Sequence, residues 1–145
     1  MLLRLLVLIL IGTIPGVVCL FLPFERSHYV VENWRIKELG VQHALKLNSL
    51  FIDARSVDEY NINHIPNALL MNSLNWDHAL LDFLERWSPE RVVVIYCDSR
   101  SCGLSKQIAI KLLTDLPEAK IRILSNGFKA WQSYQSESGE LVESQ

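Results

Sequence analysis

The stretch Arg91-Val-Val-Val-Ile-Tyr-Cys97-Asp-Ser-Arg-Ser-Cys102-Gly-Leu-Ser105 decides the fold. Its first half is a run of β-branched and aromatic residues without an interior charge, which predicts a buried strand of a parallel sheet. A short polar turn with one glycine follows, and a helical pattern begins near Leu104. Because open parallel sheets bind ligands at the carboxyl ends of their strands, we expect Cys97 to lie at a ligand-binding edge.

The turn after Cys97 has the composition of an anion-binding loop. Its residues are Asp98, Ser99, Arg100, Ser101, Cys102 and Gly103. Short side chains let successive backbone N–H groups point at one centre, and the N-terminus of the next helix adds positive potential. A thiol in such a place ionises readily, and the thiolate is the nucleophile. A buried cysteine that only packs is the alternative, but strand, glycine-bearing loop and helix together favour a reactive Cys97.

Length and composition indicate one globular domain without nucleic acid as a partner. The chain has 145 residues and a net charge of −2, and it has neither a basic stripe nor a Cys/His finger spacing. Three cysteines, one of them inside the hydrophobic N-terminus, do not form a disulfide framework. The two loop cysteines lack a third and fourth ligand for zinc, so no metal or cofactor is expected.

The N-terminus differs from the rest of the chain. Residues 5–24 carry no charge, and about 20 apolar residues span a bilayer as a helix. A cleaved signal peptide is the alternative, but Val18 interrupts the small-x-small cleavage pattern. We therefore expect residues 1–24 to form an uncleaved transmembrane anchor. The short N-terminal tail favours a domain outside the cytoplasm, on the periplasmic side if the protein is bacterial, although the flanking basic residues are nearly balanced.

Strands and helices are expected to alternate after a charged tether at residues 25–34, and a short edge strand can follow the tether by residue 37. The pattern predicts strands over 50–55, 69–71, 91–96 and 119–125, and helices over 38–47, 75–87, 105–113 and 128–134. Residues 135–145 are acidic and poor in apolar side chains, so we expect a disordered tail. The alternation predicts an α/β fold with a central parallel sheet flanked by helices on both faces.

Local signals refine the region after the second strand. Ser56 and Glu59 have the spacing of a capping box, which predicts the start of a short helix. Asn63 and Asn67 stand in a turn-rich passage and can take left-handed backbone angles more readily than most residues.

Four segments together resemble the rhodanese-like domain family. They are Ile-Asp-Ala-Arg-Ser-Val-Asp-Glu-Tyr at 52–60, His-Ile-Pro-Asn-Ala at 64–68, Val-Ile-Tyr-Cys at 94–97 and Asn-Gly-Phe-Lys-Ala-Trp at 126–131. The resemblance covers residues 35–134 and implies a three-layer α/β fold with a central parallel sheet. It also implies a sulfurtransferase. In that chemistry the cysteine matching Cys97 takes sulfane sulfur from thiosulfate or a persulfide donor, carries it as a persulfide and passes it to a thiol acceptor.

Departures from the family pattern keep other functions open. Active members typically carry a basic residue five positions after the cysteine, where this chain has Cys102. Related phosphatases use an arginine one position later, where Gly103 stands, so phosphoryl transfer lacks its clamp. Cys102 can instead serve as a resolving thiol in a Cys97–Cys102 dithiol relay, if the Cα atoms come within about 7 Å. The domain can also be an inactive module that binds a membrane partner, because a fold does not imply a function.

Three polar residues near the expected site are interpreted as structural. Asp53 and Arg55 follow a strand and are expected to form ion pairs that tie loops together, because an unpaired buried charge is costly. His64 precedes Ile65-Pro66 and is expected to hydrogen-bond the turn rather than act as a base. The sequence as a whole predicts a membrane-anchored rhodanese-like sulfurtransferase that acts through Cys97.

Overall fold

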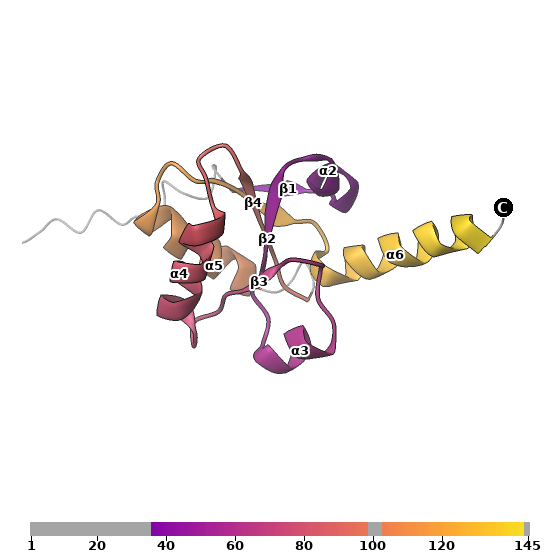
Figure 1. The fold of residues 1–145 in the computed structure, drawn as a ribbon, viewed down its shortest axis with the longest axis horizontal. Coiled ribbons are helices and arrows are strands. Elements are labelled where there is room, and N and C mark those ends of the chain that lie inside the picture. The colour runs from indigo at the N-terminus through magenta and orange to yellow at the C-terminus, as the bar shows by residue number, and fades with distance from the viewer. Residues whose placement is uncertain (1–35, 99–102, 144–145) are drawn as a thin grey trace, which may run out of the picture. The chain divides into compact units, whose positions relative to one another are not determined.

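A parallel sheet is the centre of the fold in the computed structural model, which describes residues 36–98 and 103–143 (Figure 1). The strands in these ranges are β1 (Lys37–Leu39), β2 (Ser49–Asp53), β3 (Leu69–Leu70), β4 (Val92–Tyr96) and β5 (Lys120–Leu124). Their order across the sheet is β1-β5-β4-β2-β3, and each neighbouring pair is parallel. The predicted α/β fold with a central parallel sheet is therefore confirmed.

Strand β4 occupies the middle of the sheet, as its uncharged run predicted. Ile95 pairs with Ile52 of β2 on one side and with Ile123 of β5 on the other. The side chains from Val93 to Tyr96 are fully buried. A strand with neighbours on both sides and helices on both faces has no surface exposed to solvent, which explains why its sequence is continuously apolar.

Helices cover both faces of the sheet. They are α2 (Val41–Lys46), α3 (Val57–Ile62), α4 (Trp76–Arg86), α5 (Leu104–Asp115) and α6 (Gly127–Glu143). Figure 1 shows α4 and α5 on one side of the sheet and α2 and α6 on the other. Val93, Ile95 and Cys97 pack in the core on the α4 and α5 side, whereas Val94 and Tyr96 pack in the core on the α2 and α6 side. The period of two along β4 thus assigns Cys97 to the α5 side.

The capping box predicted at the start of α3 is present. The Ser56 hydroxyl accepts from the Glu59 backbone N–H, at 3.3 Å, and the Glu59 carboxylate accepts from the Ser56 backbone N–H, at 3.0 Å. The Ser56 hydroxyl also donates to the Glu59 carboxylate, and these bonds lower the pKa of Glu59. Side chains at the start of α3 therefore satisfy backbone N–H groups that the helix itself leaves unpaired at its N-terminus.

The predicted start of the first helix at Glu38 was wrong, and only one of the two asparagines in the turn-rich passage is left-handed. Residues 37–39 form an edge strand against β5, so the helix expected from Glu38 begins only at Val41. Asn63 has an extended backbone with φ −166°, and only Asn67 takes the left-handed conformation, with φ 63°. The Asn63 carbonyl accepts a hydrogen bond from Arg55 at 2.7 Å, a long-range contact that local turn statistics do not contain.

The closing helix is longer than the sequence predicted. We expected a helix over 128–134 and a disordered tail over 135–145, but α6 continues to Glu143. Residues 135–143 contain no proline. The hydroxyls of Ser136 and Ser138 bond to the carbonyls of Ser133 and Tyr134, so these polar residues are accommodated within the helix.

The expected anchor and tether, residues 1–24 and 25–34, lie outside the described residues. Among residues 36–98 and 103–143, the helices are too short or too polar to cross a bilayer.

A tight turn joins β5 to α6 and presses against the end of β4. Asn126 and Gly127 both have positive φ values, 61° and 57°. A Cβ atom on residue 127 would lie only 2.2 Å from the Cys97 carbonyl oxygen. Only glycine allows this approach, which brings the Phe128 N–H within 2.7 Å of the same oxygen.

We predict that Gly127→Ala destabilises the protein by at least about 2 kcal/mol, because the new Cβ combines a left-handed backbone penalty with a backbone collision. Urea denaturation of the full-length chain measures this. Gly40→Ala is the control, because Gly40 has a negative φ of −73° and open space around its Cβ position. Gly40 precedes α2, where alanine costs about 1 kcal/mol or less relative to glycine. Equal losses for both variants would contradict the prediction.

Candidate active site

Cys97 lies at the carboxyl end of the central strand, as the sequence predicted. It directly follows β4 and is 2% exposed. Its Sγ lies 3.6 Å from the hydroxyl of Ser105, a residue of α5 that is 3% exposed. A serine hydroxyl at this position can donate a hydrogen bond to a thiolate or a persulfide.

The flanks of the expected anion-binding loop are described, but its middle is not. Residues 99–102, including the proposed resolving thiol Cys102 and Arg100, lie outside the described residues. Asp98 is exposed, and Gly103 is exposed at the N-cap of α5. The twelve-residue helix α5 therefore begins directly after the loop, with its positive end toward it.

The first turn of α6 holds the backbone on the exit side of β4. The N–H groups of Phe128 and Lys129 donate to the carbonyls of Cys97 and Asp98, at 2.7 and 3.4 Å. The Lys129 ammonium lies 3.9 Å from the Asp98 carboxylate, but both side chains are more than half exposed, so this pair adds little. Backbone hydrogen bonds therefore fix the position of Cys97.

Asp53 and Arg55 form a buried ion pair at the end of β2. Arg55 Nη2 lies 2.6 Å from Asp53 Oδ2, and Arg55 Nε lies 3.0 Å from Asp53 Oδ1. Arg55 also donates to the Asn63 carbonyl and lies over the Phe128 ring, 3.9 Å from its centroid. The expected ion pair is thus present, and it joins β2, the turn after α3 and α6.

Tyr96, a polar core residue that the sequence analysis did not single out, lies beside this pair. Its hydroxyl accepts from the Ile65 N–H at 3.1 Å, and its ring lies under the Arg55 guanidinium. Burial, followed by the negative charge of Asp53, raises the pKa of Tyr96 far above its ordinary value. The phenol therefore stays neutral and serves as a structural hydrogen-bonding group.

His64 contacts the turn in which it stands. Its Nδ1 lies 2.9 Å from the Tyr60 carbonyl, so the N–H donates to that oxygen. Its ring stacks on the Tyr60 ring with centroids 3.9 Å apart, and the Tyr60 hydroxyl donates to the Ala68 carbonyl. These contacts stabilise the turn that joins α3 to β3.

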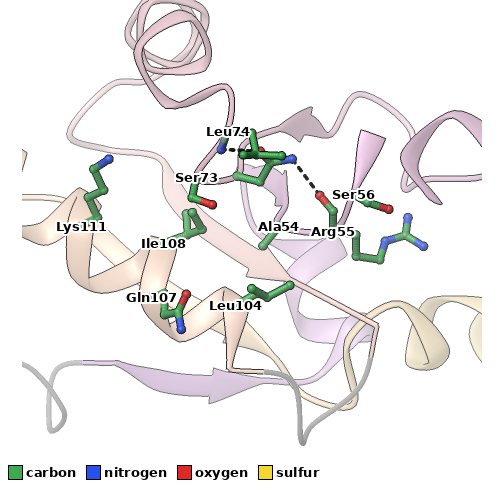
Figure 2. Close-up of a pocket in the computed structure, with 10 residues that line it drawn as sticks. Ala54, Arg55, Ser56, Ser73, Leu74, Leu104, Gln107, Ile108 and Lys111 are labelled. Atoms are coloured by element: carbon green, nitrogen blue, oxygen red, sulfur yellow. Dashed lines mark hydrogen bonds between the residues drawn. The ribbon is translucent and has the colours of Figure 1, made fainter. Parts of the chain in front are cut away.

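A pocket of about 330 Å³ lies on the α5 side of the sheet, a size typical of small-molecule sites (Figure 2). Figure 2 shows Leu104, Gln107 and Lys111 along α5, facing the loop that carries Ser73 and Leu74. The remaining lining residues are Ala54, Arg55, Ser56, Asn72 and Ile108. Asn72 connects the two segments that line the pocket opposite α5. Its side-chain amide N–H donates to the Arg55 carbonyl, and its side-chain oxygen accepts from the Leu74 N–H.

The sequence analysis missed Ser105 and the pocket. Ser105, Ile108, Ala109 and Leu112 are all buried and share the helical spacing i, i+3, i+4, i+7. This periodicity places Ser105 on the core face of α5, and it was the available signal. The pocket had no such signal, because its walls come from segments distant in the sequence. Within the described parts of the chain, no three His, Cys, Asp or Glu side chains gather as metal ligands.

We predict that Asp53→Asn destabilises the protein by about 3–5 kcal/mol, because it leaves the Arg55 charge buried without its counter-charge. The double variant Asp53→Leu/Arg55→Met removes both charges and should be more stable than Asp53→Asn. Urea denaturation of the full-length variants compares them. A double variant as unstable as Asp53→Asn would show that charge pairing is not the main contribution.

We predict that His64→Ala lowers stability and leaves the chemistry of Cys97 intact in the folded fraction, because the described contacts of His64 belong to the turn. The measurement is thermal unfolding together with thiosulfate-dependent sulfur loading per folded molecule. His43→Ala, on the exposed face of α2, is the control and should change neither quantity. A stable His64→Ala protein that fails to load sulfur would give His64 a chemical role.

Comparisons with known proteins agree with this geometry. The model of the rhodanese-like domain family matches residues 37–134. No curated protein sequence matches the chain. Among solved structures, protein BH2092 from Bacillus halodurans is 21% identical with a TM-score of 0.54, and the match covers 68% of this chain and 73% of that one.

Two further structures share the fold at similar identity. The N-terminal domain of a putative ATP/GTP binding protein from Clostridium difficile is 20% identical with a TM-score of 0.50, over 68% of this chain and 98% of that one. Reduced CoADR-RHD from Bacillus anthracis is 18% identical with a TM-score of 0.51, over 72% of this chain and 18% of that one. At such identities the structures support the fold alone, whereas the family match spans most of the chain. With Cys97 at the end of its central strand, this chain belongs to the rhodanese-like domain family.

Proposed function

We propose that this protein is a sulfurtransferase that moves sulfane sulfur from thiosulfate or a persulfide donor to a thiol acceptor through Cys97. The observation that carries the proposal is the position of Cys97 in a rhodanese-like domain. Its sulfur lies at the end of the central parallel strand, 3.6 Å from a buried hydroxyl and close to the positive end of α5. Donor, acceptor and catalytic residue are all part of this proposal.

The first step loads Cys97. With thiosulfate as the donor, the Cys97 thiolate attacks the outer sulfur, a new S–S bond forms, and the bond to the sulfonate sulfur breaks. Sulfite leaves with the bonding electron pair, and Cys97 becomes a persulfide anion. The Ser105 hydroxyl is placed to donate a hydrogen bond to Cys97 sulfur, and the N-terminus of α5 favours the anionic charge.

The second step discharges the persulfide. The Cys97 persulfide anion first takes up a proton from water. A thiolate acceptor then attacks the outer sulfur of Cys97–S–SH, and a new S–S bond to the acceptor forms. The bond between the outer sulfur and Cys97 Sγ breaks, its electron pair stays on Sγ, and the products are an acceptor persulfide and the Cys97 thiolate. The loop residues Asp98, Ser99, Arg100, Ser101, Cys102 and Gly103 are proposed to surround these anions with backbone N–H groups.

We also propose that residues 1–24 anchor the protein in a membrane with the domain outside the cytoplasm. The support is the uncharged stretch at 5–24 and the short tail before it. The partners in this proposal are the membrane, a small sulfur-containing anion or persulfide, and a thiol.

The first prediction from this mechanism is that full-length protein, once reduced and exposed to thiosulfate, gains the mass of one sulfur atom. Cys97→Ser should gain none, because it lacks the accepting thiolate, and added thiol should return the loaded protein to its starting mass. Intact-mass spectrometry measures each state. Loading that persists in Cys97→Ser would disprove the mechanism.

Cys102→Ser distinguishes sulfur transfer from the alternatives. Under the proposed mechanism Cys102→Ser still loads sulfur, with an altered rate. A loss of two hydrogens that requires both Cys97 and Cys102 would favour the dithiol relay. A mass that changes in neither way would favour an inactive module that binds a membrane partner.

A further inference from the structure

We propose that Asp98 and Lys129 determine how strongly the site at Cys97 discriminates between sulfur donors of different charge. Asp98 disfavours a donor with two negative charges relative to a donor with one, and Lys129 weakens this discrimination. The proposal rests on sulfur loading at Cys97. It adds the donor property that the site selects and the two side chains that select it.

The Asp98 carboxylate lies near the reacting sulfur because Asp98 directly follows Cys97 in the chain. Covalent geometry keeps a carboxylate at this position within about 10 Å of Cys97 Sγ. Over such a distance, the repulsion between a carboxylate and a dianion is still significant in water. The repulsion doubles with the charge of the donor, so Asp98 opposes a dianion more strongly than a monoanion.

Lys129 belongs to α6, and backbone hydrogen bonds fix its position beside Asp98. The Lys129 N–H donates to the Asp98 carbonyl at 3.4 Å, and the N–H of Phe128 donates to the Cys97 carbonyl at 2.7 Å. Gly127 permits this approach, because a Cβ atom there would lie 3.1 Å from the Asp98 carbonyl carbon. The first turn of α6 therefore brings a cation to the residue that begins the loop.

The two opposite charges meet in a loose and exposed contact. Lys129 Nζ lies 3.9 Å from Asp98 Oδ2, and the side chains are 65% and 53% exposed. A pair of this kind contributes little free energy, so an arriving anion can attract Lys129 away from Asp98 at little cost. Arg55 differs, because it is buried and already paired with Asp53 at 2.6 Å. Asp98 and Lys129 therefore act on an incoming donor as two separate charges of opposite sign.

A second exposed ion pair, at the opposite edge of the sheet, provides a matched control. Lys120 Nζ lies 3.7 Å from Glu90 Oε2, and these side chains are 53% and 89% exposed. Lys120 pairs in the sheet with Val92, five residues before Cys97 on the chain. That separation corresponds to about 17 Å along the strand, well beyond the Debye length of about 10 Å at 0.1 M ionic strength. The Lys120–Glu90 pair therefore has the same chemistry without the proximity to Cys97.

The test compares two donors that react in the same way and differ by one charge. Thiosulfate carries two negative charges and methanethiosulfonate carries one. In both reactions the Cys97 thiolate attacks the outer sulfur, an S–S bond forms, and sulfite or methanesulfinate leaves with the bonding electron pair. Rapid quenching and intact-mass spectrometry of reduced full-length protein give the second-order rate constant of loading. The decisive quantity is the ratio of the thiosulfate to the methanethiosulfonate rate constant, because changes in the reactivity of Cys97 itself cancel from it.

Variants of the pair should shift this ratio in opposite directions at about 0.1 M ionic strength. Asp98→Asn should raise the ratio about twofold, because loss of a like charge accelerates the dianion more than the monoanion. Lys129→Met should lower it by a similar factor, and Lys129→Arg should retain the wild-type ratio because the charge is kept. The double variant Asp98→Asn/Lys129→Met should fall between the two single variants.

Salt and the distant pair serve as controls. At about 1 M salt the Debye length falls to about 3 Å, so the ratios of all variants should converge. Lys120→Met and Glu90→Gln remove the same kinds of charge at the far edge of the sheet, and they should leave the ratio at its wild-type value.

The outcomes separate this proposal from the function on which it rests. If both donors load Cys97 but Asp98→Asn and Glu90→Gln give the same ratio, charge selection by the pair is overturned and sulfur transfer stands. Charge selection is equally overturned if Asp98→Asn changes both rate constants by one common factor, because the residue then acts on the loop and not on the donor charge. If Cys97 gains sulfur from neither donor, the proposed function fails, and the selection of donors fails with it.

Discussion

One backbone carbonyl, that of Cys97, determines how the carboxyl edge of this sheet is built. The oxygen lies beyond the last residue of β4 and takes its hydrogen bond from the first turn of α6. A helix begins with unpaired N–H groups, and a strand that leaves a sheet ends with unpaired carbonyls, so each end satisfies the other. The contact is so close that residue 127 has room for a glycine alone. Helix α6 and the candidate nucleophile are consequently parts of one rigid junction.

The same junction is supported from the other side by a buried charge. Arg55 pairs with Asp53, donates to the Asn63 carbonyl and lies over the ring of Phe128, the residue whose N–H donates to the Cys97 carbonyl. Phe128 therefore takes part in both arrangements, through its backbone in one and its ring in the other. Burying an ion pair contributes little net stability, but it strongly penalises arrangements that separate the two charges. Its effect here is to specify how β2, the turn after α3 and α6 meet.

The sequence predicted the parts of this molecule that depend on local patterns. The charge-free run before Cys97 identified the central strand, and the Ser56–Glu59 spacing identified the start of α3. Local patterns were insufficient where a distant partner decides. Asn63 is extended while its carbonyl accepts a bond from Arg55, and the strand at the end of the tether continues to Leu39, where a helix was expected, because it pairs with β5. The extent of α6 was underestimated because polar composition was taken for disorder. The pocket could not be predicted, since it exists only where α5, the end of β2 and the loop at 72–74 come together.

The alternation of side chains along β4 sends neighbouring residues into the two cores on opposite faces of the sheet. Tyr96 points to the side where Arg55, Phe128 and α6 secure the fold, whereas Cys97 points to the side of α5 and the pocket. Tyr96 and Cys97 are neighbours in the chain, but their side chains lie on opposite faces of the sheet. Arg55 connects the two sides, because it lines the pocket while its guanidinium pairs with Asp53. In evolutionary terms, the exposed α5 residues that line the pocket are free to vary while the opposite, buried face of the same helix keeps its packing on the sheet.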